Sequence, residues 1–167
     1  MRRSHAAGRG PTGGCDRGCG KIVRTVPLRL WQLFKRVHVF RVKPGRELLG
    51  DMASFCRKHG VTSGVVLGII GSLRSARLNF LKELPGRYES VDYSGPIEIV
   101  AAQGTVALEG DNLIIHVHIQ LSRPDLCCGG HLAEAIVFST AEVVIAELEQ
   151  QLRRRPDSYT GLKELAD

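Results

Sequence analysis

Aromatic side chains are scarce in this 167-residue chain. Phe, Trp and Tyr make up 5% of the residues, whereas 43% are hydrophobic, so a core must be mainly aliphatic. Every long apolar stretch is interrupted by charge or glycine, and the sequence therefore predicts no transmembrane helix. The basic N-terminus also lacks the continuous apolar segment of a secretory signal. We therefore expect a cytoplasmic protein without a membrane partner.

The chain also lacks an even number of cysteines, because it has five. An odd number without an export signal argues against a disulfide framework, so reduced thiols are expected. Cys15 and Cys19 lie close together, but no second ligand pair follows them, and no metal knuckle is predicted there. Cys127 and Cys128 are either thiolate ligands or small apolar residues in a loop.

The sequence shows no recognisable Ser–His–Asp or Cys–His arrangement, and no carboxylate pair has a spacing that assigns acid and base roles. It therefore identifies no catalytic residue. The segment 71–76 follows an apolar stretch, as a phosphate loop does, but it lacks the spacing and the lysine of a P-loop. A tight turn is the preferred interpretation. Arg74 and Arg77 are still candidates for contact with an anionic ligand.

Positive charge is concentrated at one end of the chain. Residues 1–36 contain nine Lys/Arg and one acidic residue, a net charge of +8, whereas the rest contains 14 basic and 16 acidic residues, a net charge of −2. Residues 1–20 have too little apolar surface to fold and are predicted to be disordered. A basic arm on a near-neutral body can bind a polyanion through the arm alone.

The basic arm contains the candidate DNA-binding residues Arg2, Arg3, Arg9 and Arg17. Arg9 lies in the sequence Gly-Arg-Gly-Pro, which invites comparison with arms that place arginine in the narrow minor groove of A·T-rich DNA. An Arg-Gly-Arg-Pro core is absent. Nonspecific attraction to phosphate explains these arginines equally well, and a solvated arm without a function is a further alternative.

From Val37 onward the hydrophobic pattern predicts one helix and about six or seven strands. Apolar residues at helical spacing predict a helix over 46–59, which Gly60 would end. Gly71-Ser72 and Gly95-Pro96 are expected to end strands, and 122–130 to form a loop. The strands are drawn from these segments: 37–42, 65–70, 76–81, 88–93, 97–103, 104–108, 113–121 and 136–145.

The order of these elements predicts an α+β fold. Strands joined mostly by hairpin-length connections indicate a compact, mostly antiparallel sheet flanked by helices, and strands do not alternate with helices as they do in doubly wound nucleotide-binding folds. We divide the chain into a basic leader (1–36), a folded domain (37–148) and a C-terminal tail partly packed on that domain (149–167).

Three histidines form the main candidate site. Side chains alternate between the two faces of a strand, so His116 and His118 project side by side from the face opposite the core. His131 follows two glycines, where a tight bend would bring a third imidazole close. Three neutral imidazoles with an open fourth position suit Zn²⁺ or a similar divalent ion. Alternatively, these are surface histidines on a solvated sheet face.

Four blocks resemble the PPC domain, the plant- and prokaryote-conserved domain, which also occurs in AT-hook nuclear-localised plant proteins. The resemblance covers about 37–148 and rests on Gly71–Leu78, His116–His118, Gly129–Leu132 and Thr140–Ile145. It implies a compact antiparallel sheet flanked by helices, and a homotrimer. It also implies association with DNA, largely through the AT-hook in plant members. In some prokaryotic members it implies a metal site, here at the three histidines.

Three functional hypotheses follow. The first is a trimeric DNA-binding or DNA-associated regulatory protein, which would be associated with the nucleoid. The second is a metal-dependent enzyme or small-molecule-binding protein that uses the three histidines, with Glu98, Glu134 or Glu142 as a base. The third is an assembly module in which Val65–Ile70 and Ile136–Ile145 are buried between subunits.

Overall fold

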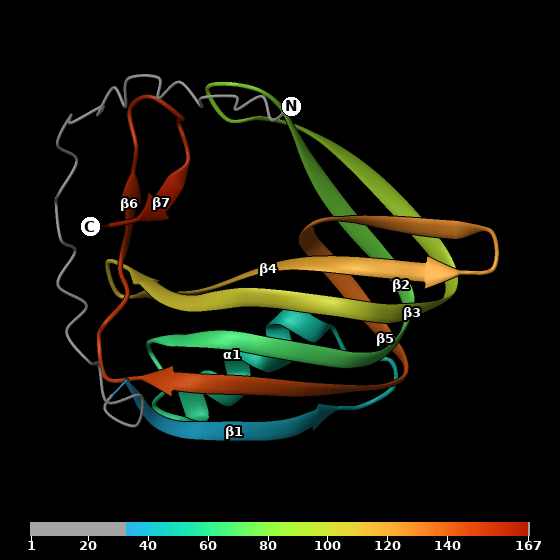
Figure 1. The fold of residues 1–167 in the computed structure, drawn as a ribbon, viewed down its shortest axis with the longest axis horizontal. Helices are drawn as coiled ribbons and strands as arrows, with labels where there is room; N and C mark the ends of the chain where they lie inside the picture. Colours follow the sequence, from blue (N-terminus) through green and yellow to red (C-terminus); the bar gives the residue numbers. More distant parts are fainter. Residues whose placement is uncertain (1–32, 167) are drawn as a thin grey trace, which may run out of the picture.

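The structure is a computed structural model that describes residues 33–166. A five-stranded antiparallel sheet dominates it, and a small two-stranded sheet follows (Figure 1). The elements, in chain order, are β1 (Phe34–Val42), α1 (Leu48–His59), β2 (Gly64–Glu83), β3 (Arg87–Glu109), β4 (Asn112–Arg123), β5 (Leu126–Leu148), β6 (Arg154–Pro156) and β7 (Lys163–Leu165).

The predicted antiparallel sheet is confirmed, but the predicted flanking helices are not. Within 33–166 the structure contains the single helix α1. The strand order is β1-β5-β2-β3-β4, and β4 pairs with β5 as well. This second pairing is possible because β5 is long: Leu126–His131 pairs with β4, and Ala141–Leu148 pairs with β1. The sheet therefore curls on itself rather than staying flat.

Three strands are much longer than the sequence suggested, since β2 has 20 residues and β3 and β5 have 23 each. The strand ends expected at Gly71-Ser72 and Gly95-Pro96 were wrong. Register shifts on either side of Leu73 let β2 bend and continue, as bulges do. Gly71 is needed for a close approach, because a Cβ there would collide with the carbonyl oxygen of Thr140.

Helix α1 packs one apolar face on the sheet. Leu48, Met52 and Cys56 recur at helical spacing and are fully buried. Gly60 ends the helix with a left-handed φ of 69°, as predicted. The Glu47 carboxylate accepts hydrogen bonds from the first turn and from the Ala135 N–H of β5, which ties the helix to the sheet. No helix of the described part of the chain is long and apolar enough to cross a membrane.

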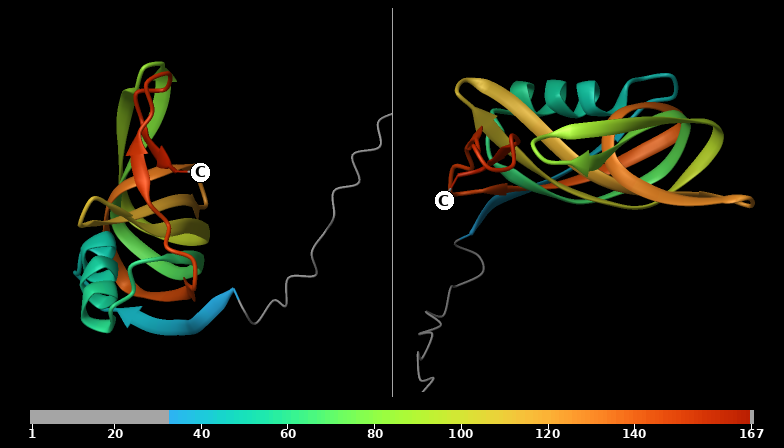
Figure 2. Two further views of the ribbon diagram at one scale, coloured as in Figure 1. Left: turned by 90° about the vertical axis from the view of Figure 1, so that its left-hand side faces the viewer. Right: turned by 90° about the horizontal axis from the view of Figure 1, so that it is seen from above.

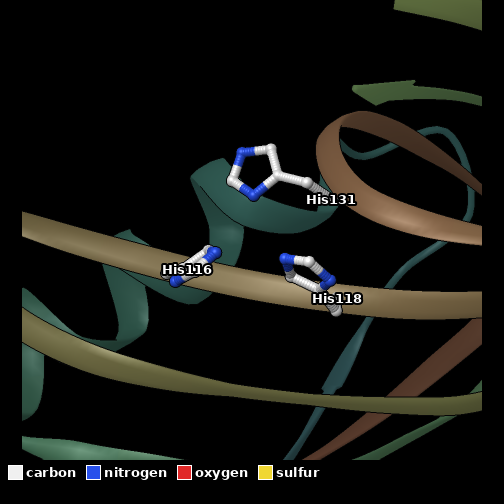
Figure 3. Close-up of side chains that lie close together, drawn as sticks. All are labelled: His116, His118 and His131. Carbon is white, nitrogen blue, oxygen red and sulfur yellow. The ribbon is translucent and has the colours of Figure 1, made fainter. Parts of the chain in front are cut away.

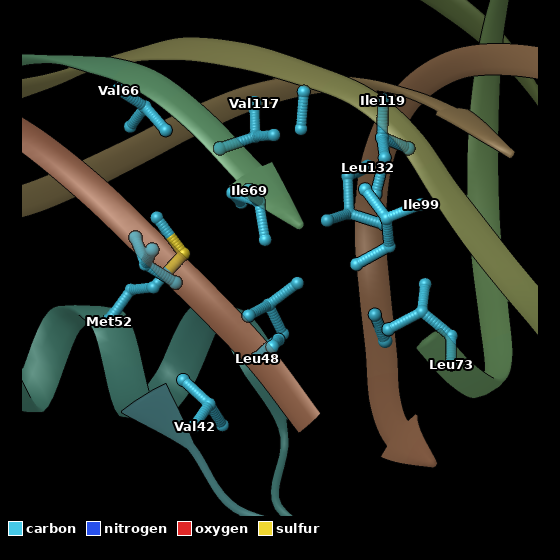
Figure 4. Close-up of a cluster of buried hydrophobic side chains, with 14 of the residues drawn as sticks. Val42, Leu48, Met52, Val66, Ile69, Leu73, Ile99, Val117, Ile119 and Leu132 are labelled. Atoms are coloured by element: carbon cyan, nitrogen blue, oxygen red, sulfur yellow. The ribbon is translucent and has the colours of Figure 1, made fainter. Parts of the chain in front are cut away.

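The core is mainly aliphatic, as the composition predicted. It lies between α1 and the curled sheet (Figure 4). Each fully buried Leu, Ile, Val or Met side chain contributes about 1.5–3 kcal/mol relative to its exposed state. The buried residues labelled in the figure are Val42, Leu48, Met52, Val66, Ile69, Leu73, Ile99, Val117, Ile119 and Leu132.

The face of the sheet that points away from α1 carries exposed apolar side chains. In β1, His38 and Val42 are buried, so the alternate residues Val37 and Val39 point outward and are 54% and 71% exposed. In β2, Leu67 and Ile70 are 50% and 70% exposed. These four residues form what we call the outer apolar patch.

The long β2–β3 hairpin projects from the body, and the C-terminal β6–β7 hairpin lies beside it (Figure 2). The two meet near their tips, where the Gly86 N–H donates to the Thr160 carbonyl oxygen at 2.9 Å. The Leu108 N–H donates to the Leu152 carbonyl oxygen at 3.1 Å and anchors the base of the second hairpin. The tail therefore contacts the domain both near the tip and at the base of this hairpin.

Candidate metal centre

Strand β4 places His116 and His118 on one face, as the alternation predicted. Val117 and Ile119 between and beyond them are 0% and 3% exposed and point into the core. His116 is partly buried and His118 exposed on the opposite face. A single strand thus supplies two imidazoles, whose ring centroids lie 5.2 Å apart.

His131 joins them by strand pairing and not by a turn. It is the direct cross-strand partner of His118 in β4 and of Asn79 in β2. The predicted loop 122–130 and the bend at Gly129-Gly130 were wrong, because β5 already begins at Leu126. The glycines are needed for close packing instead: a Cβ at Gly130 would lie 3.1 Å from the Phe80 ring.

The three imidazoles converge on one point (Figure 3). The ring centroid of His131 lies 4.9 Å from that of His116 and 5.5 Å from that of His118. Tetrahedral binding of three imidazoles to one zinc ion at about 2.0–2.1 Å places their ring centres about 5 Å apart. The donor nitrogens lie within 4.8 Å of one another, a grouping that could hold one metal ion. The geometry fits a zinc-type ion.

The surroundings keep two of these imidazoles, those of His116 and His131, neutral. Burial, followed by the charge of Arg154 and the other two histidines, lowers the pKa of His116 from 6.5 to about 4. Burial, His118 and Arg154 likewise lower the pKa of His131. A neutral imidazole retains the lone pair that a metal requires, so protonation does not prevent either ring from binding a metal at neutral pH.

Arg154 of β6 contacts the histidine cluster and was missed by the sequence analysis. Its Nη2 donates to His116 Nδ1 and to Thr105 Oγ1, both at 2.9 Å, and its Nη1 donates to the Lys163 carbonyl oxygen at 2.8 Å. Burial lowers the pKa of Arg154. No local pattern relates residue 154 to residue 116, so only the path of the tail reveals this contact.

A cavity of about 680 Å³ lies over the three histidines. The body of the domain supplies its floor, and the two hairpins supply its walls. Apolar side chains, among them Leu81, Ile114 and Leu162, share the lining with polar ones. Such a volume is typical of a site for a small molecule.

The other candidate residues lie outside this cavity. Arg77 forms ion pairs with Asp92 at 2.8 Å and with Glu134 at 3.2 Å, and Arg74 is exposed on β2. Neither arginine lines the cavity, nor do the candidate bases Glu98, Glu134 and Glu142.

Two further groups of candidates have different outcomes. Cys127 and Cys128 are free thiols, and neither belongs to the potential metal-binding group, which consists of the three histidines in the part of the chain that the structure describes. The candidate DNA-binding residues Arg2, Arg3, Arg9 and Arg17 lie outside the described residues.

Comparison with protein families gives a match over residues 32–149 to the Plants and Prokaryotes Conserved (PCC) domain. The chain belongs to this family. The PCC domain is the PPC domain that the four sequence blocks resemble, so the recognition from sequence is confirmed. No curated protein matches the chain significantly.

Several solved structures share the fold. A metal-containing protein from Archaeoglobus fulgidus is 25% identical, with a TM-score of 0.75 over 80% of this chain and 95% of its own. A PPC protein from Pyrococcus horikoshii is 29% identical, with a TM-score of 0.74 over 80% and 93%. A protein provisionally described as DNA-binding, from Bacteroides thetaiotaomicron, is 21% identical, with a TM-score of 0.73 over 81% and 97%.

Acid should destabilise the metal-free protein through His116. Because its pKa is about 4 in the folded chain and 6.5 ordinarily, the unfolded chain takes up the proton first as the pH falls. The free energy of unfolding therefore decreases as the pH falls through this window and is unaffected by His116 above it. Denaturant titrations at about pH 7 and pH 4.5 measure the free energy of unfolding. Between these two pH values it should decrease less in His116→Gln than in the wild type.

The control for this comparison is His59→Gln, because His59 is an exposed residue of α1. It should lose as much stability as the wild type. Equal losses in all three proteins would contradict the prediction.

Proposed function

We propose that this PCC-domain protein binds one divalent transition-metal ion, of which zinc is the best candidate, through His116, His118 and His131. The convergence of their rings, with centroids 4.9–5.5 Å apart, carries the proposal. The description of the Archaeoglobus fulgidus protein as metal-containing supports it. Three nitrogen ligands would leave a fourth position for an exchangeable ligand, and the same three histidines line the cavity.

A bound zinc-type ion acts as a Lewis acid toward an oxygen ligand. The described residues around it favour binding over catalysis. Glu164 is the one carboxylate among the residues that line the cavity, and it is exposed on β7. The chain's own contribution is to lower the pKa of His116 and His131, which keeps these two imidazoles neutral, and to shape a partly apolar space above the cluster.

Removing one histidine should abolish tight metal binding. In His118→Ala the metal affinity should fall by more than the 10- to 100-fold that removal of an outer hydrogen-bonding partner costs, since a direct ligand is missing. Metal content after purification without chelators, and competition with a chromophoric chelator, would measure this. Gln120→Ala, on the same strand and face, should bind as the wild type does. A wild-type protein that binds no metal on titration would refute the proposal.

The protein forms a homotrimer in this proposal, and the outer apolar patch supports the assembly. Val37, Val39, Leu67 and Ile70 expose half or more of their surface, and exposed apolar side chains gathered on one face of a sheet are characteristic of contact sites. A stable interface buries about 1,200–2,000 Å². The outer apolar patch would form the apolar centre of such an interface between copies of the chain.

A charge placed in the outer apolar patch should dissociate the trimer. Val39→Glu would bury an unpaired carboxylate in the contact, and sedimentation equilibrium should show the mass falling from three chains to one. Leu84→Glu places the same charge on an exposed apolar residue outside the patch and should stay trimeric. A monomeric wild-type protein would rule out the assembly.

Association with DNA is a second candidate function, favoured by the net charge of +8 in residues 1–36. The body has a net charge of −2, so Arg2, Arg3, Arg9 and Arg17 are the residues proposed to contact phosphate. A regulatory protein of this type would combine a metal-binding domain with a basic arm and would act at the nucleoid.

Replacing these four arginines by glutamine should reduce the salt dependence of DNA binding. The slope of log K against log salt falls by about 0.9 for each phosphate that the protein no longer neutralises, so we expect a decrease of about 3 to 4 in gel-shift titrations. Arg57→Gln, an exposed residue of α1, should leave the slope unchanged. If the full-length wild-type protein does not shift DNA at low salt, this candidate is eliminated.

A further inference from the structure

Arg154 is a partly buried cation that no carboxylate neutralises. Within residues 33–166, no carboxylate oxygen lies within 4.0 Å of its nitrogens, and its buried Nε has no hydrogen-bond partner. The other cation of the cavity lining, Lys163, is held by Glu109 at 2.9 Å. Arg154 is thus the free positive charge of the cavity.

The hydrogen bond between Arg154 and His116 fixes the proton on the His116 ring. A guanidinium only donates, so Nδ1 of His116 must accept with its lone pair. In a neutral ring the single proton then lies on Nε2. This ring has one lone pair, and Arg154 occupies it.

The same lone pair is required if His116 is to bind a metal. If His116 ligates through Nδ1, the metal takes the place of the Arg154 hydrogen bond. If it ligates through Nε2, the proton moves to Nδ1. The Nδ1–H group and the Arg154 N–H group are then both donors, so no hydrogen bond can form between them. In either case a neutral His116 that becomes a metal ligand must release Arg154 Nη2, which retains its bond to Thr105.

We propose that the cavity binds a small organic carboxylate and that Arg154, once released from His116, is the residue that anchors it. This inference rests on the proposed metal binding. Carboxylate is the chemistry that the guanidinium recognises best, through paired N–H donors, and carboxylate oxygen is also a ligand for a zinc-type ion. Arg154 and the three histidines would therefore bind the two ends of one anionic group.

The apolar part of the lining determines the rest of the ligand. Leu81, Ile114 and Leu162 line the same cavity as Arg154, and its volume of about 680 Å³ exceeds what a carboxylate alone fills. An aliphatic or aromatic body attached to the carboxylate would bury these side chains. The ligand class is thus a compact organic acid with an apolar body, and not an inorganic anion.

Calorimetry with the zinc-loaded full-length protein tests this with acetate, butanoate and hexanoate. Affinity should rise about fourfold for each methylene group buried. Hexanol, which has the apolar body without the charge, should not bind measurably. The zinc-free protein should bind hexanoate more weakly, because Arg154 is then still bonded to His116.

Arg154→Met removes the donors and the charge while retaining bulk. Hexanoate affinity should fall tenfold or more, roughly the contribution of a hydrogen bond to a charged group. Zinc affinity should rise by about the same factor, because nothing then competes for the His116 lone pair. Arg155→Met, one residue further along β6 and outside the cavity lining, is the matched control and should change neither value.

The outcomes separate the two proposals. A wild-type protein that takes up no zinc refutes the metal site and this inference together. Zinc uptake without hexanoate binding, or equal hexanoate affinity in the wild type and Arg154→Met, overturns this inference alone. If Arg154→Met does not fold, Arg154→Lys retains the charge and removes the paired donors, and hexanoate affinity should still fall.

Discussion

The candidate site depends on the pairing of strand β5 with three neighbours. Its first residues pair with β4, its last residues with β1, and the stretch from His131 to Glu147 pairs with β2. His131 lies where β5 passes from one partner to the next, bonded to β4 on one side and to β2 on the other. A residue at this point cannot shift without breaking two ladders, so the third imidazole is held as firmly as the two that share β4.

A balance of charges accompanies this geometry. Burial and a neighbouring guanidinium lower the pKa values of His116 and His131, which keeps both rings unprotonated but adds a positive charge close to where a metal would bind. The unprotonated imidazoles therefore favour binding of a metal cation, whereas the positive charge of Arg154 repels it. An anion that neutralises Arg154 would relieve this opposition, which couples the two kinds of ligand in one cavity.

The local parts of the fold and the site could be predicted from the sequence. The alternation around Val117 and the helical spacing before Gly60 depend on neighbouring residues, and both are present. The position of His131 was anticipated for the wrong reason, because Gly129-Gly130 was taken as a bend.

The structure differs from the sequence-based expectations mainly at glycines, where expected strand ends and bends lie inside continuous strands. A glycine in a sequence indicates either a turn or a close approach of two backbones, and only the neighbouring strand decides between them. At Gly104 a Cβ would collide with the carbonyl oxygen of His116. Gly104 therefore lets β3 approach the strand that carries His116, and no pattern in the neighbouring sequence indicates this. Arg154 escaped prediction for a similar reason, since its partners are 38 and 49 residues away in the chain.

The family match ends at residue 149, but the site does not. The three histidines lie inside the matched region, whereas Arg154 and the β6–β7 hairpin that walls the cavity lie beyond it. In the proposed site, the matched region would thus supply the metal ligands, and the β6–β7 hairpin would supply the cation that faces a bound anion. Changes in the β6–β7 hairpin alone could therefore alter the ligand of the proposed site while its three histidines stay the same.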